Sequence, residues 1–297
     1  MSECFHMKDL GPLKFFLGIE VSRGKQGIYI SQRKYTLDII SECGLVGAQP
    51  IDTPMEQNHA LAKVDGELYS NPSRYRRLVG RLVYLALTRP DLSYIVHLLA
   101  QLLAEPRQRH WEAAVRVVKY LKGTCGQGIL FSKDSDLHLD AYCDSDYNSC
   151  PKTRRSFFGY VVLLGKSHIC WKTKKQKTVS MSSAEAEYKA MAFTYQEINW
   201  LKELLLLFQV PHSEPITLHC DNKAALYIAA NPVFHERTKH IEKDCHFVRD
   251  GIKEGILSTK HIRTIEQLAD FLTKALKRQQ FLYLFRKMGV HDFHLPP

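Results

Sequence analysis

Apolar and polar positions in the first part of the chain predict a hairpin followed by a helix and a loop. Short β-rich runs at 15–21 and 27–30 flank the turn-prone segment 22–25. Residues 32–43 then show the helical period and stop at Gly44, a residue typical of the position just past a helix end. Between 47 and 72 the period is lost and Pro, Asn, Asp and Gly accumulate, which indicates a loop or linker.

Three amphipathic helices are predicted between residues 73 and 122. Their expected ranges are 74–88, 91–103 and 107–121, with Asp91 as the N-cap of the second and Gly123 ending the third. The stretch has no cluster of acids and no reactive nucleophile, so we interpret it as a helical connector that packs and positions its neighbours.

The second half alternates between strands and helices. Residues 137–142, 157–164 and 167–172 predict an antiparallel meander. Ser182 with Glu185 three residues later is a capping box, so a helix should begin there and run to about 208. A strand at 216–220, helices at 222–230 and 241–253, a strand at 256–262 and a helix at 266–276 should follow. This order predicts an α/β fold with a mixed five-stranded sheet and helices on both faces.

Charge and cysteine usage narrow the class of protein. Lys and Arg number 41 against 31 Asp and Glu, a formal net charge of +10, which favours a nucleic-acid partner if a suitable site accompanies it. The eight cysteines form no CxxC pair, so we expect reduced intracellular thiols rather than a zinc site or disulfide framework. With no apolar leader and no long apolar run, the sequence predicts a soluble, non-secreted protein without a membrane partner.

Four acidic residues stand at the ends of predicted elements. Asp144 and Asp221 close strands, while Glu187 and Asp270 lie in the first turns of helices. Taken singly, each is more readily a turn, cap or solvated residue. Together they predict a site, because hydrolysis of a phosphodiester by two divalent ions needs carboxylates from several elements to converge. Packed this closely, all four would need bound cations to stay ionised near neutral pH.

Several ordered motifs carry a family resemblance. They are Tyr142–Asp146, Ser156–Tyr160, Ser182–Tyr188, Cys220–Asn222, Arg237–Phe247 and Gln267–Lys274. With them the chain resembles the ribonuclease H domain of copia-type retrotransposon polyproteins, and residues 7–19 resemble the end of the reverse transcriptase. The resemblance implies a ribonuclease H-like fold, two Mg²⁺ ions or Mn²⁺, and action on RNA/DNA hybrids made in reverse transcription. It also implies the rest of the polyprotein as partner, no small-molecule ligand, and a location in a cytoplasmic virus-like particle or the nucleus.

Carried over by motif, the catalytic and metal-binding residues are Asp144, Glu187, Asp221 and Asp270. Two choices stay open, because Asp146 competes with Asp144, and Glu185, although it has a capping role, competes with Glu187. Cellular relatives carry a mobile histidine before the last aspartate, which makes His261 the candidate for a product-release role here, against a structural role at a strand end.

Basic residues near these motifs are the expected nucleic-acid contacts. The segment from Trp171 to Lys177 combines an aromatic ring with lysines, which suits a passing phosphate backbone, although a solvated loop explains it too. Asn222 is placed to read the 2′-hydroxyl that distinguishes RNA from DNA. His235, His240 and His246 lack the spacing of a zinc site. The full set of predicted contacts is Lys172, Lys174, Lys175, Lys177, Asn222, Arg154 and Arg155.

The predicted domains are a reverse transcriptase remnant at 1–60, a helical connector at 61–137, the ribonuclease H domain at 138–280 and a tail at 281–297. Enzymes of this class carry a Tyr-x-Asp-Asp turn ahead of residues 7–11, so no polymerase activity is expected of this chain. The first hypothesis is a two-metal endonuclease acting on the RNA strand of hybrids. An inactive remnant that keeps the fold and binds nucleic acid is the alternative. An integrase core on the same fold is a third reading, against which the Ala269–Lys274 ending speaks.

Overall fold

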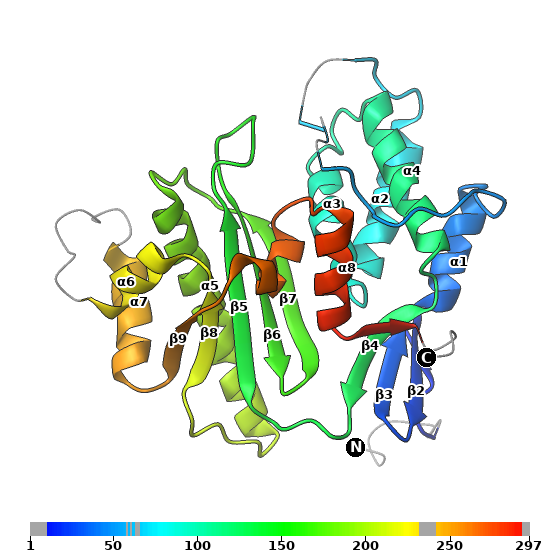
Figure 1. Cartoon of the computed structure of the whole chain (residues 1–297). Coiled ribbons are helices and arrows are strands. Elements are labelled where there is room, and N and C mark those ends of the chain that lie inside the picture. The colour runs from blue at the N-terminus through cyan, green and yellow to red at the C-terminus, as the bar shows by residue number, and fades with distance from the viewer. Residues whose placement is uncertain (1–10, 58, 60, 63–65, 232–241, 293–297) are drawn as a thin grey trace, which may run out of the picture.

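Two five-stranded sheets organise the chain (Figure 1). The structure, a computed structural model, describes residues 11–57, 59, 61–62, 66–231 and 242–292. The first sheet has the order β1-β2-β3-β4-β10 and the second the order β7-β6-β5-β8-β9. Segments 7–10 and 232–241, which contribute to the family resemblance and contain His235 and His240, lie outside the described residues.

The first sheet is antiparallel and begins with the predicted hairpin. Strands β1 (Phe15–Phe16), β2 (Ile19–Gly24) and β3 (Gly27–Ser31) are followed by helix α1 (Arg33–Glu42), so hairpin and helix are confirmed. Strand β4 (Gln127–Ser132), which the sequence pattern did not indicate, pairs with β3. Its partner on the other side is β10 (Val290–Asp292), which follows helix α8 (Arg278–Lys287). Residues 281–292 are therefore structured and not the expected tail.

The three connector helices are confirmed, with bounds that differ by a few residues from the expected ones. They are α2 (Pro72–Leu85), α3 (Ser93–Ala100) and α4 (Gln108–Lys122). The predicted N-cap role of Asp91 is wrong, because Asp91 lies inside a 3-10 turn, η1 (Pro90–Leu92), that precedes α3. Its buried carboxylate accepts hydrogen bonds from the guanidinium of Arg89 and the hydroxyl of Tyr120, which tie this turn to α4.

The second sheet has the mixed topology expected from the sequence. Strands β5 (Leu139–Asp146), β6 (Phe157–Leu164) and β7 (Ser167–Lys175) form the antiparallel meander, and β8 (Ile216–Cys220) and β9 (Leu257–His261) add parallel to β5. Helices α5 (Ser183–Leu207), α6 (Lys223–Ala230) and α7 (Glu242–Lys253) pack against one face (Figure 1). The α/β fold class with a mixed five-stranded sheet is confirmed. No helix in the described part of the chain is both long and apolar enough to span a membrane.

The other face of this sheet packs against the connector. One continuous apolar core joins side chains of α1–α4 with Phe157 and Val161 of β6, and with Phe271 and Phe281 near the C-terminus. Helix α8 lies between the two sheets (Figure 1). The second layer of helices is therefore supplied by the connector and the C-terminal segment.

The predicted helix at 266–276 is wrong in type. Two 3-10 turns, η3 (Thr264–Glu266) and η4 (Leu268–Leu272), replace it, and Gln267 between them is extended. The carbonyl of Leu272 accepts a hydrogen bond from the hydroxyl of Thr173 on β7 instead of continuing a helix. Gly159 of β6 permits this close approach, because a Cβ there would lie 2.5 Å from that of Leu272. Tertiary contacts with the sheet thus override the local helical pattern.

Candidate active site

Four carboxylates from four separate elements meet at one end of the second sheet. Asp144 comes from β5, Glu187 from the second turn of α5, Asp221 from the end of β8 and Asp270 from η4. Their charges act on one another: Asp144 and Asp221 both raise the pKa of Glu187 and that of Asp270. The structure therefore brings together the four residues that sequence alone placed at the ends of different elements.

Three of these carboxylates are removed from water. Asp144, Glu187 and Asp270 are 2%, 5% and 3% exposed, while Asp221 is half-buried. Burial is the main cause that raises the pKa of Asp144 and Glu187, and burial with the neighbouring Asp144 raises that of Asp270 to about 8. A buried set of acids with raised pKa values needs a compensating cation at neutral pH.

Lys274 supplies part of that positive charge. Its Nζ lies 2.8 Å from Oδ1 of Asp270, one turn away along the chain, and 3.6 Å from Oδ1 of Asp144. Burial alone would lower the pKa of Lys274, but the two carboxylates outweigh it and raise the pKa. Lys274 is therefore a charged member of the cluster.

Neighbouring donors fix the orientation of the carboxylates. The backbone N–H of Ser145 donates to Oε1 of Glu187 at 3.2 Å, and the hydroxyl of Thr264 donates to Oδ2 of Asp221 at 2.7 Å. The hydroxyl of Thr273 donates to Oδ2 of Asp144. One oxygen of each of these acids is thus held by the protein, which preorganises the site.

The structure distinguishes Glu185 from Glu187 by its surroundings, while Asp146 stays a competitor of Asp144. The N–H of Glu185 donates to Ser182, as the predicted cap requires, but its side chain accepts the N–H of Met181 instead of that of Ser182. The side chain also pairs with Lys189 at 2.7 Å. Asp146 lies on the same strand face as Asp144, and burial raises its pKa to about 6.

The predicted lysine contacts do not share one surface. Strand β7 runs to Lys175, and its alternation places Lys172 and Lys174 opposite Tyr160 and Phe158, on the face that α5 covers. Lys175 points the other way and donates to Gln101 of the connector. Trp171 is also a packing residue, since its indole N–H donates to the carbonyl of Ala86. Lys177 is exposed beyond the strand end.

The remaining predicted residues lie in three different places. The side-chain oxygen of Asn222 caps α6 by accepting the N–H of Ala225. Arg154 and Arg155 lie in the loop between β5 and β6. His261 ends β9 and is exposed, in a pocket of about 470 Å³ that none of the four acids lines.

Sequence reasoning missed three polar neighbours of the acids, Lys274, Thr273 and Cys220. The spacing of four residues between Asp270 and Lys274 is a recognisable pairing signal on a helical segment. The contacts of Thr273 with Asp144 and of Cys220 with Glu187 join residues far apart in the chain, so only the fold reveals them.

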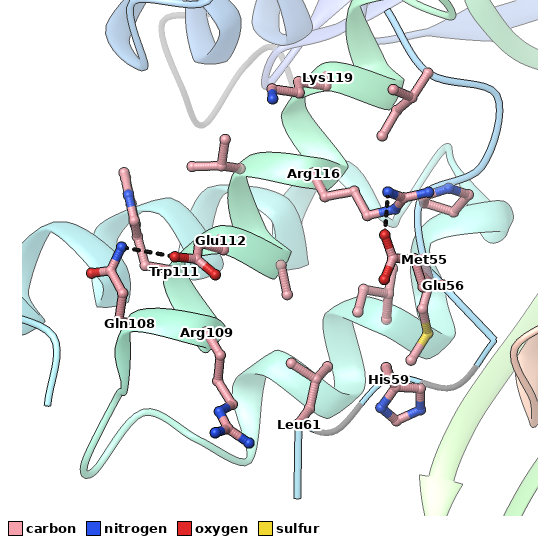
Figure 2. Close-up of a pocket in the computed structure, with 15 residues that line it drawn as sticks. Met55, Glu56, His59, Leu61, Gln108, Arg109, Trp111, Glu112, Arg116 and Lys119 are labelled. Atoms are coloured by element: carbon pink, nitrogen blue, oxygen red, sulfur yellow. Dashed lines mark hydrogen bonds and ion pairs between the residues drawn. The ribbon is translucent and has the colours of Figure 1, made fainter. Parts of the chain in front are cut away.

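A larger pocket, of about 800 Å³, lies on the connector and shares no residue with the carboxylate cluster (Figure 2). Its charged side chains are largely paired within it: Arg116 binds Glu56 at 2.8 Å, and Gln108 donates to Glu112 at 3.1 Å.

Comparison with known proteins places the chain in a family. The model for "Reverse transcriptase (RNA-dependent DNA polymerase)" matches residues 1–57. The Pol polyproteins of transposons RE2 and RE1 of Arabidopsis thaliana are 44% and 42% identical over 100% and 98% of this chain. The chain belongs to the copia-type retrotransposon Pol family. This Pol segment spans about a fifth of the length of either relative, 20% in each case, and matches a C-terminal part.

Some solved structures are similar to part of this copia-type chain. The structure described as LC11-RNase H1 in complex with RNA/DNA hybrid aligns over 46% of this chain and 93% of its own, with 14% identity and a TM-score of 0.36.

The donor set of the copia-type site fits hard divalent cations. Carboxylate oxygens are the ligands that Mg²⁺ and Mn²⁺ prefer, and here three of the four acids are buried. Lys274 contributes a single positive charge, which is fewer than the four carboxylates require. Asp144, Glu187, Asp221 and Asp270 would therefore hold the metal.

Proposed function

We propose that residues 138–280 are a metal-dependent ribonuclease H domain that hydrolyses the RNA strand of RNA/DNA hybrids. The convergence of Asp144, Glu187, Asp221 and Asp270 from four elements supports this most strongly. The match to retrotransposon Pol polyproteins supports hybrids as the substrate, because reverse transcription produces them.

Two Mg²⁺ ions, or Mn²⁺, when bound would activate the attacking water and stabilise the leaving oxygen. The chain's own residues prepare this site. Ser145, Thr264 and Thr273 hold one oxygen of each of three acids, and burial excludes bulk water around them. Lys274 keeps Asp144 and Asp270 close together despite their like charges.

We propose that the hybrid approaches from the side of Asp221, the most exposed of the four acids. Asn222 follows Asp221 directly, and its side-chain N–H₂ is not used in the cap that its oxygen makes. It would contact a 2′-hydroxyl of the RNA strand. Lys172, Lys174, Lys177 and the arginines Arg154 and Arg155 would contact phosphates farther from the scissile bond.

The direct test offers the purified chain four duplexes in Mg²⁺: a hybrid labelled on the RNA strand, the same hybrid labelled on the DNA strand, double-stranded RNA and double-stranded DNA. The proposal predicts cutting of the RNA strand of the hybrid alone. Binding of the hybrid without any cutting would support the inactive, nucleic-acid-binding alternative.

A further inference from the structure

Two aspartates of the site directly follow a cysteine, although Asp144 does not close its strand as expected, because β5 continues to Asp146. Cys143 precedes Asp144 on β5 and Cys220 precedes Asp221 on the neighbouring parallel strand β8. Both thiols are fully buried, and their side chains lie within hydrogen-bond reach of each other. Two sulfur atoms thus lie directly beneath the carboxylates.

The two thiols have different hydrogen-bond partners. The thiol of Cys143 donates to the backbone carbonyl of His219 at 3.8 Å. That of Cys220 lies 3.8 Å from Oε2 of Glu187. Ligand atoms of Glu187, Cys220 and Asp221 lie within 4.8 Å of one another, so a sulfur and two carboxylate oxygens surround one point.

Each of these three groups is oriented by a neighbour. Ser145 holds Oε1 of Glu187, and Thr264 holds Oδ2 of Asp221. The backbone N–H of Asn222 donates to Sγ of Cys220 at 3.4 Å, a contact that fixes the position of the sulfur. Outer contacts of this kind fix the ligands of protein metal sites.

A sulfur ligand changes which ion the site prefers. Thiolate is a poor ligand for Mg²⁺ and a strong one for Zn²⁺, which takes sulfur at about 2.3 Å and carboxylate oxygen at about 2.1 Å in tetrahedral geometry. Such a site places its ligands roughly 3.5 Å apart. The three groups here would need to close by about an ångström, which side-chain rotation can supply.

We propose that Cys220, Glu187 and Asp221 form a binding site for Zn²⁺ that overlaps the Mg²⁺ site. Binding forms one Zn–S and two Zn–O bonds and releases the thiol proton of Cys220 to water, while a water molecule takes the fourth position. The ion enters past Asp221, the half-buried ligand. Since Glu187 and Asp221 serve both ions, Zn²⁺ would inhibit hydrolysis in competition with Mg²⁺; this last consequence rests on the proposed function.

The test is metal binding by the full chain, reduced and freed of metal, and it needs no hydrolysis. Co²⁺ is added as a spectroscopic probe, and the thiolate-to-metal charge-transfer absorption is followed. The wild type should give this band, and Zn²⁺ should abolish it at lower concentration than Mg²⁺ does. Cys220→Ser should lose the band and bind Zn²⁺ at least about tenfold more weakly.

Cys143→Ser is the matched control and should keep the band. It removes the adjacent buried thiol, which donates to the carbonyl of His219 and does not belong to the group of three ligands. Circular dichroism checks that each variant folds. Should Cys220→Ser not fold, Asp221→Asn replaces a partly exposed ligand and should weaken Co²⁺ binding at least about tenfold. A wild type without the band, or a folded Cys220→Ser that keeps it, would overturn the proposal. A chain that binds Zn²⁺ through Cys220 but cuts no hybrid would refute the nuclease and leave this site standing.

Discussion

The ammonium of Lys274 lies 2.8 Å from Oδ1 of Asp270, with Asp144 on its other side. Lys274 therefore provides positive charge at the point where divalent cations are expected. Replacing it with an uncharged residue leaves two buried carboxylates with less compensation.

Lys274→Met should lower the free energy of unfolding of the metal-free chain by about 1–3 kcal/mol, a figure reduced because Lys274 keeps some contact with water. Mg²⁺ should restore more stability to this variant than to wild type, and Lys274→Arg, which keeps the charge, should behave like wild type. Thermal unfolding in chelator and in Mg²⁺ measures both effects. If Mg²⁺ raised the unfolding temperature of the wild type and of Lys274→Met by the same amount, Lys274 would not offset the charges of these carboxylates.

The raised pKa of Asp270 predicts a pH dependence of stability in the absence of metal. Folding raises this pKa from 3.8 to about 8, so between these values the folded state binds more protons than the unfolded state. Stability therefore falls as pH rises through this window, by at most about 1.4 kcal/mol per pH unit for one proton.

Urea unfolding in chelator at several pH values compares the wild type with Asp270→Asn, which cannot ionise. The variant should gain stability relative to the wild type from pH 5 to pH 8. If the free energies of unfolding of the two proteins changed in parallel with pH, the assignment of a raised pKa to Asp270 would be contradicted.

Gly159 permits the close approach of η4 to β6, which positions Asp270. In Gly159→Ala the new methyl group meets Cβ of Leu272 at 2.5 Å, so η4 must shift. We expect a loss of about 1–3 kcal/mol in stability and of roughly tenfold or more in hybrid cleavage.

Gly80→Ala in α2 is the control, since a Cβ there meets nothing within 4 Å and Ala favours a helix by about 1 kcal/mol. Measured by thermal unfolding and cleavage rate, it should leave cleavage unchanged. A Gly159→Ala protein with wild-type cleavage would show that η4 tolerates the shift.

Asp91 and Arg89 form a fully buried ion pair that Tyr120 completes. Asp91→Ala should cost about 3–5 kcal/mol, because it leaves the guanidinium of Arg89 buried without its partner. The exposed pair of Arg278 and Asp52 is the matched comparison, and Asp52→Ala should cost less than about 1 kcal/mol. Chemical denaturation measures the free energy of unfolding of both variants. Similar losses of stability in Asp91→Ala and Asp52→Ala would show that burial does not set the strength of these ion pairs.

Elements with strong local signals were predictable from the sequence. The capping residues Ser182 and Glu185 start α5, and strand alternation placed β5, so the positions of Glu187 and Asp144 followed from short-range patterns. The 3-10 geometry around Asp270 was not predictable, because the approach of Gly159 and the hydrogen bond from Thr173 that create it come from distant strands.

Long-range hydrogen bonds inside the site were equally hidden from the sequence. Asp144 and Thr273 are 129 residues apart, and Cys220 meets Glu187 only because β8 lies against the start of α5. Strand alternation places Lys172 and Lys174 on one face of β7 and Lys175 on the other. The sequence did not show that the connector covers the face of Lys175.

The measurement that tests the account most directly is Mg²⁺-dependent cleavage of an RNA/DNA hybrid labelled on the RNA strand. It compares the wild type with Asp144→Asn and with Asp146→Asn, which alters the same face of the same strand. We expect the wild type to cut the RNA strand, Asp146→Asn to retain most of this cutting and Asp144→Asn to lose it. Undiminished cutting by Asp144→Asn, or no cutting by a folded wild type that binds the hybrid, would contradict it.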